Sequence, residues 1–182
     1  AALCELYEIL RAKHANLFMI ITPRHVERRD EVMACFAEKN LSFARRSQVD
    51  EYAETTAPDL LFVDTTGELG NFYSVADVVF VGKSLTEHGG QNPIEPATRG
   101  KAVVVGPNME NFPSIMPTFL NADAIRQVAD AQSLAAEVDR LVAHADERAA
   151  LGDRAARVVA DNRGVIERTV ALLDAEWVDA PS

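Results

Sequence analysis

The chain has 182 residues, of which 48% are hydrophobic and 25% are charged. This length fits one globular domain of ordinary size, and this composition excludes a wholly disordered chain. The formal net charge of −10 argues against a nucleic-acid-binding protein, because binding phosphate backbones requires a broad basic face. A small anion site is still compatible with this charge, since one or two arginines and a few backbone amides suffice to hold a phosphate.

The cysteines, Cys4 and Cys35, lie in segments with helical periodicity and lack the spacing of a metal site. We interpret them as buried free thiols of a reducing compartment, and a Cys4–Cys35 disulfide is the less favoured alternative. No apolar run reaches the length of about 18 to 20 residues that a membrane-spanning helix needs, and no signal peptide is visible. Because the chain begins inside a helical pattern and its first methionine is Met19, we expect upstream sequence to be missing.

Predicted helices and strands alternate along the chain. Helical spacing of apolar residues, such as the face formed by Leu3, Leu6, Tyr7 and Leu10, predicts helices at 3–14, 26–40, 68–75, from about 93, and through most of 133–177. Short apolar runs, typical of strands buried on both faces, predict strands at 17–21, 41–45, 60–63, 78–81, 102–105 and 125–128. Residues 46–58 are polar and predict a loop, and the last helical stretch is expected to break near Asp146 and at Asn162-Arg163-Gly164.

This alternation predicts an α/β fold: a Rossmann-like parallel sheet with helices on both faces. In such a fold, ligands bind beyond the carboxyl ends of the strands. The loops that can carry chemistry are therefore those that follow strands, at 22–25, 64–68, 82–92 and 106–112.

The loop at 82–92 runs into a predicted helix. Gly89-Gly90 allows a ligand to approach the backbone closely, and Asn92 and Pro93 suit the N-cap and the first helical position. Free amide N–H groups at such a helix start form a site for phosphate or carboxylate. Glu95 in the first turn could accept hydrogen bonds from sugar hydroxyls. The alternative is an ordinary strand–helix loop in which Glu95 only offsets the helix dipole, and the spacing alone favours neither.

Two further loops offer weaker signals. Gly67-Glu68 follows a strand and could turn its amides towards the same crevice, although simple capping by Thr65 or Thr66 explains the pattern better. Arg24 follows the first strand and could pair with a phosphate or carboxylate through its forked donors. A lone arginine at such a position is more often a solvated side chain.

Several classes of site are missing from the sequence. No His, Cys, Asp and Glu residues have the spacing of a metal site, and neither a Gly-x-Ser-x-Gly elbow nor a P-loop is present. We therefore expect no metal and no cofactor.

Taken together, the loops resemble one family, the bacterial 3-deoxy-D-manno-octulosonic acid (Kdo) transferases. The resemblance follows the chain in order and is strongest in Gly89-Gly90-Gln91-Asn92-Pro93-Ile94-Glu95-Pro96. The other matching stretches are Pro23-Arg24-His25, Asp64-Thr65-Thr66-Gly67-Glu68-Leu69, Tyr73 with Ala76-Asp77-Val78 and Phe80-Val81-Gly82, Gly106-Pro107 with Asn111-Phe112, and Asn162-Arg163-Gly164.

The resemblance implies a GT-B glycosyltransferase built from two Rossmann-like domains that face a cleft. Residues 1–182 would form a single domain, the C-terminal one, which binds the donor CMP-Kdo. The acceptor site for a lipid A precursor, the membrane contacts and the catalytic base would belong to an N-terminal domain absent from this chain, so no catalytic residue is expected here. The family implies a place at the cytoplasmic face of the bacterial inner membrane, no metal, and a fragment that is soluble and inactive by itself.

The resemblance also implies roles for individual residues. Arg24 would contact the donor's phosphate or carboxylate, the Gly67 and Glu68 region would hold the nucleotide, and Glu95 would bind ribose or sugar hydroxyls. The anionic part of the donor would be cradled by Gly89, Gly90, Gln91 and Asn92. Lys83 departs from the family, which usually has glycine there; it would either contact the donor or point to solvent.

Other functions stay open at this stage. The same fold could serve a UDP-sugar transferase or epimerase half, or a non-catalytic module that binds a nucleotide. A response-regulator-like interaction domain is disfavoured, because no acidic phosphoacceptor cluster is present.

Overall fold

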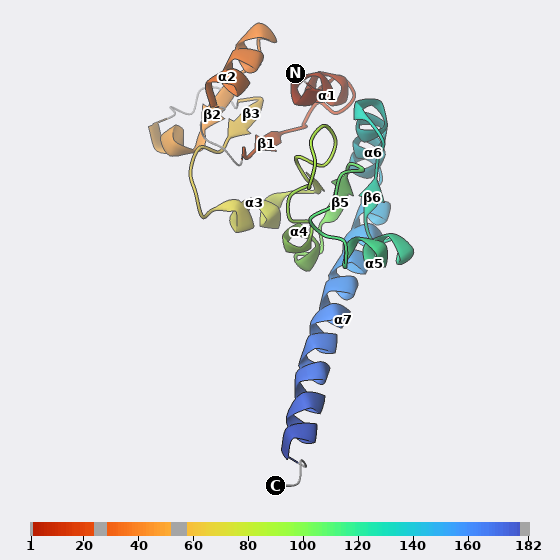
Figure 1. Ribbon diagram of the computed structural model, residues 1–182. Coiled ribbons are helices and arrows are strands. Elements are labelled where there is room, and N and C mark those ends of the chain that lie inside the picture. The colour runs from red at the N-terminus through yellow and green to blue at the C-terminus, as the bar shows by residue number, and fades with distance from the viewer. Residues whose placement is uncertain (1, 24–28, 52–57, 179–182) are drawn as a thin grey trace. The chain divides into compact units, whose positions relative to one another are not determined.

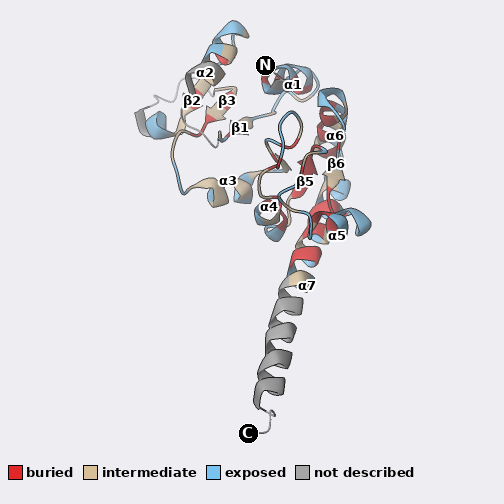
Figure 2. Ribbon diagram, viewed as in Figure 1, coloured by how far each residue is buried: buried red, intermediate tan, exposed pale blue. Residues whose placement is uncertain are grey.

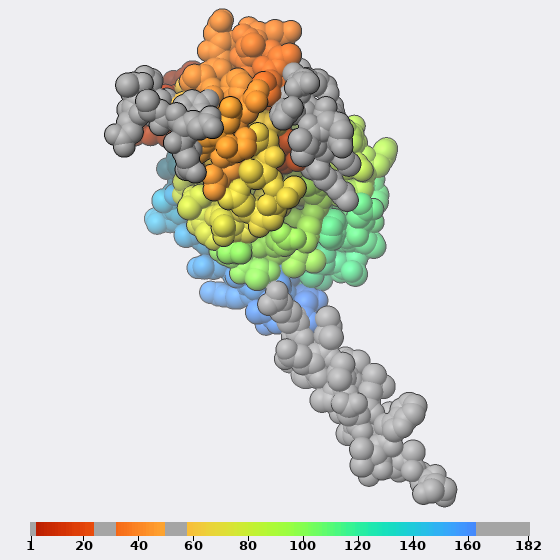
Figure 3. Space-filling view, turned by 90° about the vertical axis from the view of Figure 1, so that its left-hand side faces the viewer, coloured from red at the N-terminus to blue at the C-terminus, as the bar shows by residue number. Residues whose placement is uncertain are grey.

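The computed structural model describes the backbone of residues 2–23, 29–51 and 58–178, and the side chains of these residues except 2, 29–31, 50–51 and 163–178 (Figure 3). The chain divides into two compact units, Ala1–Val75 and Ala76–Ser182. The single donor-binding domain that the sequence predicts over 1–182 stays a prediction.

The first unit is built on a three-stranded parallel sheet. The central strand β3 (Leu60–Phe62) pairs on one side with β1 (Met19–Ile21) and on the other with β2 (Phe43–Arg45). The other elements are α1 (Ala2–Arg11), α2 (Arg29–Glu38), the 3-10 helix η2 (Arg46–Glu51) and α3 (Leu69–Val75) (Figure 1). A hydrophobic cluster that includes Tyr7, Phe36 and Phe62 joins α1, α2 and the sheet.

The two cysteines meet between α1 and α2. Cys4 is buried and Cys35 half-buried, both are free thiols, and their Sγ atoms lie 2.6 Å apart. Burial, with the hydrogen bond from Cys35 in second place, raises the pKa of Cys4 to about 12. Both cysteines are therefore free thiols as predicted, but only Cys4 is buried. Lys39, directly after α2, forms an ion pair with Glu8 of α1, from Lys39 Nζ to Glu8 Oε2 at 2.8 Å.

The second unit has its own three-stranded parallel sheet. The central strand β5 (Ala102–Val105) pairs with β4 (Val78–Phe80) and β6 (Arg126–Gln127). Every residue of β5 is buried, as the red strand in Figure 2 shows. The helices are α4 (Ile94–Thr98), α5 (Met116–Asn121), α6 (Ala131–Ala143) and α7 (Ala145–Val178).

The predicted α/β architecture is confirmed, and all described strand pairs are parallel. The six strands form two sheets of three, where the sequence predicted one sheet. Hydrophobic runs identify buried strands, but they carry no information about which strands are neighbours.

Three local predictions are wrong. The chain does not break at Asn162-Arg163-Gly164, because α7 continues through it (Figure 1); one glycine inside a helix costs only about 1 kcal/mol. Part of the predicted loop is the helix η2, and Leu3 is exposed while its neighbour Cys4 is buried. The helix α5, a short helix that buries Met116 and Phe119, was not predicted from the sequence.

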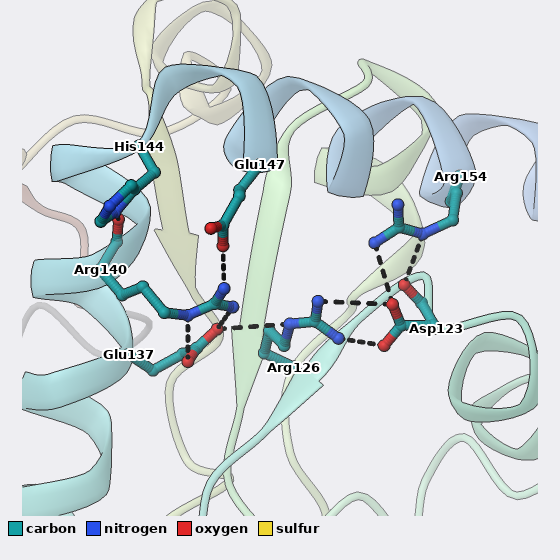
Figure 4. A network of polar contacts seen from close by, with 7 residues as sticks. All are labelled: Asp123, Arg126, Glu137, Arg140, His144, Glu147 and Arg154. Carbon is teal, nitrogen blue, oxygen red and sulfur yellow. Dashed lines mark hydrogen bonds and ion pairs between the residues drawn. The ribbon is translucent and has the colours of Figure 1, made fainter.

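Figure 4 shows a network of ion pairs that joins α6 and α7 to the segment around β6. Glu137 Oε1 lies 3.3 Å from Arg126 Nε and 2.6 Å from Arg140 Nη2. Asp123 accepts from Arg126 and from Arg154 Nη2, the latter at 3.1 Å. With Glu147 bound to Arg140, the network neutralises its own three arginines with three carboxylates. These ion pairs link α6 and α7 to the segment around β6, and they leave none of the three arginines without a carboxylate partner.

Candidate functional site

The loops that follow β4 and β5 are locked together at the carboxyl ends of these adjacent strands. Ser84 is fully buried, and its Oγ donates to the Val81 carbonyl at 2.6 Å and accepts from the Gly106 amide at 2.7 Å. The Ser84 carbonyl accepts a third bond, from the Asn108 amide at 2.9 Å. Loops 82–92 and 106–112, which the sequence assigned to the ligand edge of a sheet, therefore form one structure.

The glycine pair of the first loop is pressed against the second loop. A Cβ on Gly89, whose φ is +95°, would lie 2.6 Å from Asn111 Nδ2. A Cβ on Gly90, whose φ is +49°, would lie 2.3 Å from Met109 Sδ. A side chain at either position would thus have a strained backbone and would have to displace Asn111 or Met109. The protein's own contacts therefore favour glycine here, whereas the sequence alone suggested the approach of a ligand as the reason.

The amides around the glycine pair are largely used inside the protein. Gly89 N donates to Glu110 Oε2 at 2.7 Å, and Gln91 N donates to the Gly82 carbonyl at 3.2 Å. Ile94 N donates to Asn92 Oδ1 at 2.9 Å. The expectation of free amides here is wrong for these three groups, because the loop satisfies its own buried donors. Binding of a substrate by Gly89, Gly90, Gln91 and Asn92 stays a prediction.

The helix after this loop is short. α4 spans five residues, with Pro93 at its N-cap, so the predicted helix start is displaced by one residue. Asn92 still caps the helix through its side chain, and its Nδ2 holds Glu95 Oε1 at 2.9 Å. Because the macrodipole sums over aligned peptides, a helix of this length offers little to an anion or to Glu95. The Glu95 carboxylate is exposed and is oriented by Asn92, so it presents a fixed acceptor at the protein surface.

In the first unit, Glu68 is held by Thr65 and by Arg46, and of these two only Thr65 was singled out from the sequence. Its Oε1 accepts from Arg46 Nε at 3.1 Å and Nη2 at 2.8 Å, and its Oε2 accepts from the Thr65 hydroxyl. These bonds, Thr65 first, lower the pKa of Glu68. Gly67 has φ +84° with open space around its Cβ position, so its backbone conformation is what requires glycine. Arg24 lies outside the described residues.

Asp64, in the same loop, is a second anchored carboxylate. Burial opposes its ionisation, but bonds from the Ser47 amide at 2.9 Å and hydroxyl at 2.7 Å lower its pKa. Arg46 and Ser47 both lie in η2, which the sequence showed only as polar loop. No periodic signal marks these residues, because each acts through a partner 17 or 22 positions away.

Lys83 occupies a backbone conformation that suits glycine. Its φ is +64°, in the left-handed region, and its side chain is exposed next to the buried Ser84. This gives a physical reason for glycine at the corresponding place in the family that the sequence resembles.

Within the described residues, no group of three or more His, Cys, Asp and Glu side chains could hold a metal ion. No helix in that part of the chain is both long and apolar enough to cross a membrane.

No protein-family model matches the chain. It is 33% identical over 168 residues to the 3-deoxy-D-manno-octulosonic acid transferase of Haemophilus influenzae, covering 92% of this chain and 39% of that protein. The transferase of the same name from Bordetella pertussis is also 33% identical, over 172 residues, with 92% and 39% covered. The chain thus spans about two fifths of the length of these curated relatives.

A solved structure matches the fold as well. The crystal structure of the C-terminal CMP-Kdo binding domain of WaaA from Acinetobacter baumannii superposes with a TM-score of 0.77 and 31% sequence identity. The match covers 85% of this chain and 80% of that one.

We predict that Gly106→Ala destabilises the protein by at least about 2 kcal/mol, because the new methyl group must fit where the Ser84 carbonyl oxygen lies 2.2 Å away. Urea unfolding followed by circular dichroism measures this change. The matched control is Gly82→Ala, in the same pair of loops, where nothing lies within 4 Å of the added Cβ. Equal unfolding midpoints for the two variants would contradict the conclusion that Ser84 and Gly106 lock the two loops together.

A second prediction concerns Lys83. Replacing it by glycine removes a left-handed strain of about 1 kcal/mol and adds about 0.5 kcal/mol of unfolded-state entropy, so Lys83→Gly should stabilise the protein by about 0.5 kcal/mol. Thermal unfolding of the two proteins gives the difference. Lys101→Gly is the control, because Lys101 is not among the residues with positive φ, and there the same change should destabilise. A lower midpoint for Lys83→Gly would show that interactions of the lysine side chain stabilise the protein by more than the left-handed backbone strain destabilises it.

Proposed function

Because the chain belongs to the 3-deoxy-D-manno-octulosonic acid transferase family, we propose that it is the part of such an enzyme that binds the sugar donor CMP-Kdo. The observation that carries this proposal is the match to the C-terminal CMP-Kdo binding domain of WaaA, which extends over 85% of the chain. The family predicted from the loop motifs is confirmed by this match and by the relatives. In the whole protein, this domain would form one half of a GT-B glycosyltransferase.

The proposed reaction is a displacement at the anomeric carbon of Kdo. A hydroxyl of a lipid A precursor attacks this carbon and forms the new glycosidic bond, while the bond to the CMP phosphate oxygen breaks and CMP leaves with the electron pair. The hydroxyl proton goes to a base in the part of the enzyme outside this chain. The task of this chain is to bind the donor and to stabilise the negative charge that develops on the departing phosphate.

The proposed role of Glu95 follows from the geometry of its loop, and that of Arg24 follows from the family resemblance. Asn92 fixes the Glu95 carboxylate at 2.9 Å, which preorganises an acceptor for ribose or sugar hydroxyls. This role is a better account of Glu95 than offsetting the helix dipole, since α4 has only five residues. Arg24 would supply the guanidinium that pairs with the donor's phosphate or carboxylate. We propose that neither metal nor cofactor takes part.

The remaining partners belong to the whole protein. We propose that the lipid A precursor binds outside this chain and that the full enzyme works at the cytoplasmic face of the bacterial inner membrane. The chain itself would then contact only the nucleotide sugar.

Calorimetric titration of this chain with CMP and with UMP tests the donor class. We expect CMP to bind at least about tenfold more tightly, a difference of about 1.4 kcal/mol, because a site for a CMP-sugar has to distinguish cytosine from uracil at the 4-position. The affinity should not change on addition of EDTA. Tighter binding of UMP and of UDP-sugars would favour a UDP-sugar enzyme half and contradict the proposal.

In the whole transferase, Arg24→Ala and Glu95→Ala should each lower kcat/KM for Kdo transfer by about 100-fold, the usual effect of losing one preorganised charge or hydrogen-bonding group. Radiolabelled Kdo transfer to a lipid A precursor measures this loss. Asp153→Asn, which changes an exposed carboxylate on α7, is the control and should leave kcat/KM unchanged. Full activity of both loop variants would remove these residues from the site.

A further inference from the structure

One backbone amide of the proposed donor loop already donates a hydrogen bond to a carboxylate of the protein. Glu110 Oε2 accepts from Gly89 N at 2.7 Å, and Glu110 Oε1 lies 3.0 Å from His88 Nδ1. Gly89 is buried, whereas the Glu110 and His88 side chains are 54% and 89% exposed. The contact therefore lies at the surface end of a buried N–H group, where a ligand from solvent can reach it.

The rest of the loop does not depend on this carboxylate. Ser84 holds the Gly106 and Asn108 amides, and Met109 packs against the Gly90 position. The backbone of loop 82–92 is thus fixed by contacts with Gly106, Asn108 and Met109, none of which involves the Glu110 side chain. Removing the Glu110 charge should leave the shape of the loop intact.

The Glu110 carboxylate has the same chemistry as the anionic groups of the proposed ligand. CMP-Kdo presents a phosphate and a carboxylate, and both are anionic oxygen acceptors like Glu110 Oε2. The hydrogen bonds, from His88 first and then from backbone amides that include Gly89, lower the pKa of Glu110 to about 2. Glu110 is therefore ionised throughout the pH range of ordinary binding experiments, and its charge repels a second anion at the same N–H.

We infer that Glu110 is an internal competitor for the donor: its carboxylate holds the Gly89 N–H in the free protein and gives way to an anionic group of the ligand when the ligand binds. The inference rests on the proposed function and adds to it a residue that sets donor affinity. In the wild type, the Gly89 N–H exchanges its charge-assisted hydrogen bond to Glu110 for a similar bond to the ligand. The binding free energy of the ligand therefore gains little from this N–H. Without the Glu110 carboxylate, the same N–H donates only to water, and an anionic ligand gains by replacing that bond with a charge-assisted one and by losing the repulsion from Glu110.

The opposite role, a clamp that keeps the loop in its binding shape, leads to the opposite result. A clamp makes Glu110→Ala bind the ligand more weakly, while Glu110→Gln, whose amide oxygen can still accept from Gly89 N, binds like the wild type. A competitor makes both variants bind more tightly. The sign of the change therefore separates the two roles.

The test is a titration of the wild-type chain, Glu110→Gln and Glu110→Ala with CMP, followed by calorimetry and by the 15N–1H signal of Gly89. We expect the Kd for CMP to fall by about threefold for Glu110→Gln and about tenfold for Glu110→Ala, with the Gly89 signal moving on addition of CMP. The control Glu87→Gln removes an exposed carboxylate from the same loop without removing the contact to Gly89, and its Kd should stay within about twofold of the wild type. Circular dichroism confirms the fold of each variant.

The outcomes are distinct. If the wild type binds CMP and both Glu110 variants bind it equally or more weakly, the competitor role is wrong and the proposed function stands. If Glu87→Gln gains as much as Glu110→Gln, the effect is one of net charge and the inference is overturned. If neither the wild type nor any variant binds CMP, the proposed function fails and the inference fails with it.

Discussion

The candidate site depends on the buried hydroxyl of Ser84. This single group spans from the Val81 carbonyl at the end of β4 to the Gly106 amide at the end of β5. Because the group is fully buried, both partners would otherwise lose their hydrogen bonds to water without compensation. The bond therefore fixes the separation of two loops that start from adjacent strands, and every later contact between them follows from that spacing.

The contacts between loops 82–92 and 106–112 explain Gly89 and Gly90 more completely than the approach of a ligand does. Once the loops are held at this distance, a Cβ on Gly89 or Gly90 would meet the side chain of Asn111 or Met109, and both glycines have positive φ. The loop conformation is therefore supported by contacts within the protein itself. Such preorganisation is what an electrostatic site needs, since groups that are already in place cost no reorganisation when charge develops.

The arginines of the ion-pair network and Arg46 are neutralised by nearby carboxylates, although the protein as a whole is acidic. The formal net charge is −10, yet the proposed ligand is an anion. The arginines of the α6–α7 network are neutralised by Asp123, Glu137 and Glu147, and Arg46 is committed to Glu68. In the proposed donor loop, backbone amides are then groups that can receive an anion, and the amide of Gly89 already donates to Glu110. Under the proposed competition, the release of this carboxylate would help to set the affinity for the ligand.

The sequence by itself determined the fold class, the strands and the family, but not α5 or η2. The apolar run Ala102-Val103-Val104-Val105 predicted a strand buried on both faces, and the motif at 89–96 identified the family, because both signals are local. The tertiary structure alone decided the partners: Ser84 with Gly106, Glu110 with Gly89, Arg46 with Glu68, and Cys4 with Cys35. These pairs are 21 to 31 positions apart, and only the pairing of the strands and the packing of the helices bring them within hydrogen-bonding distance.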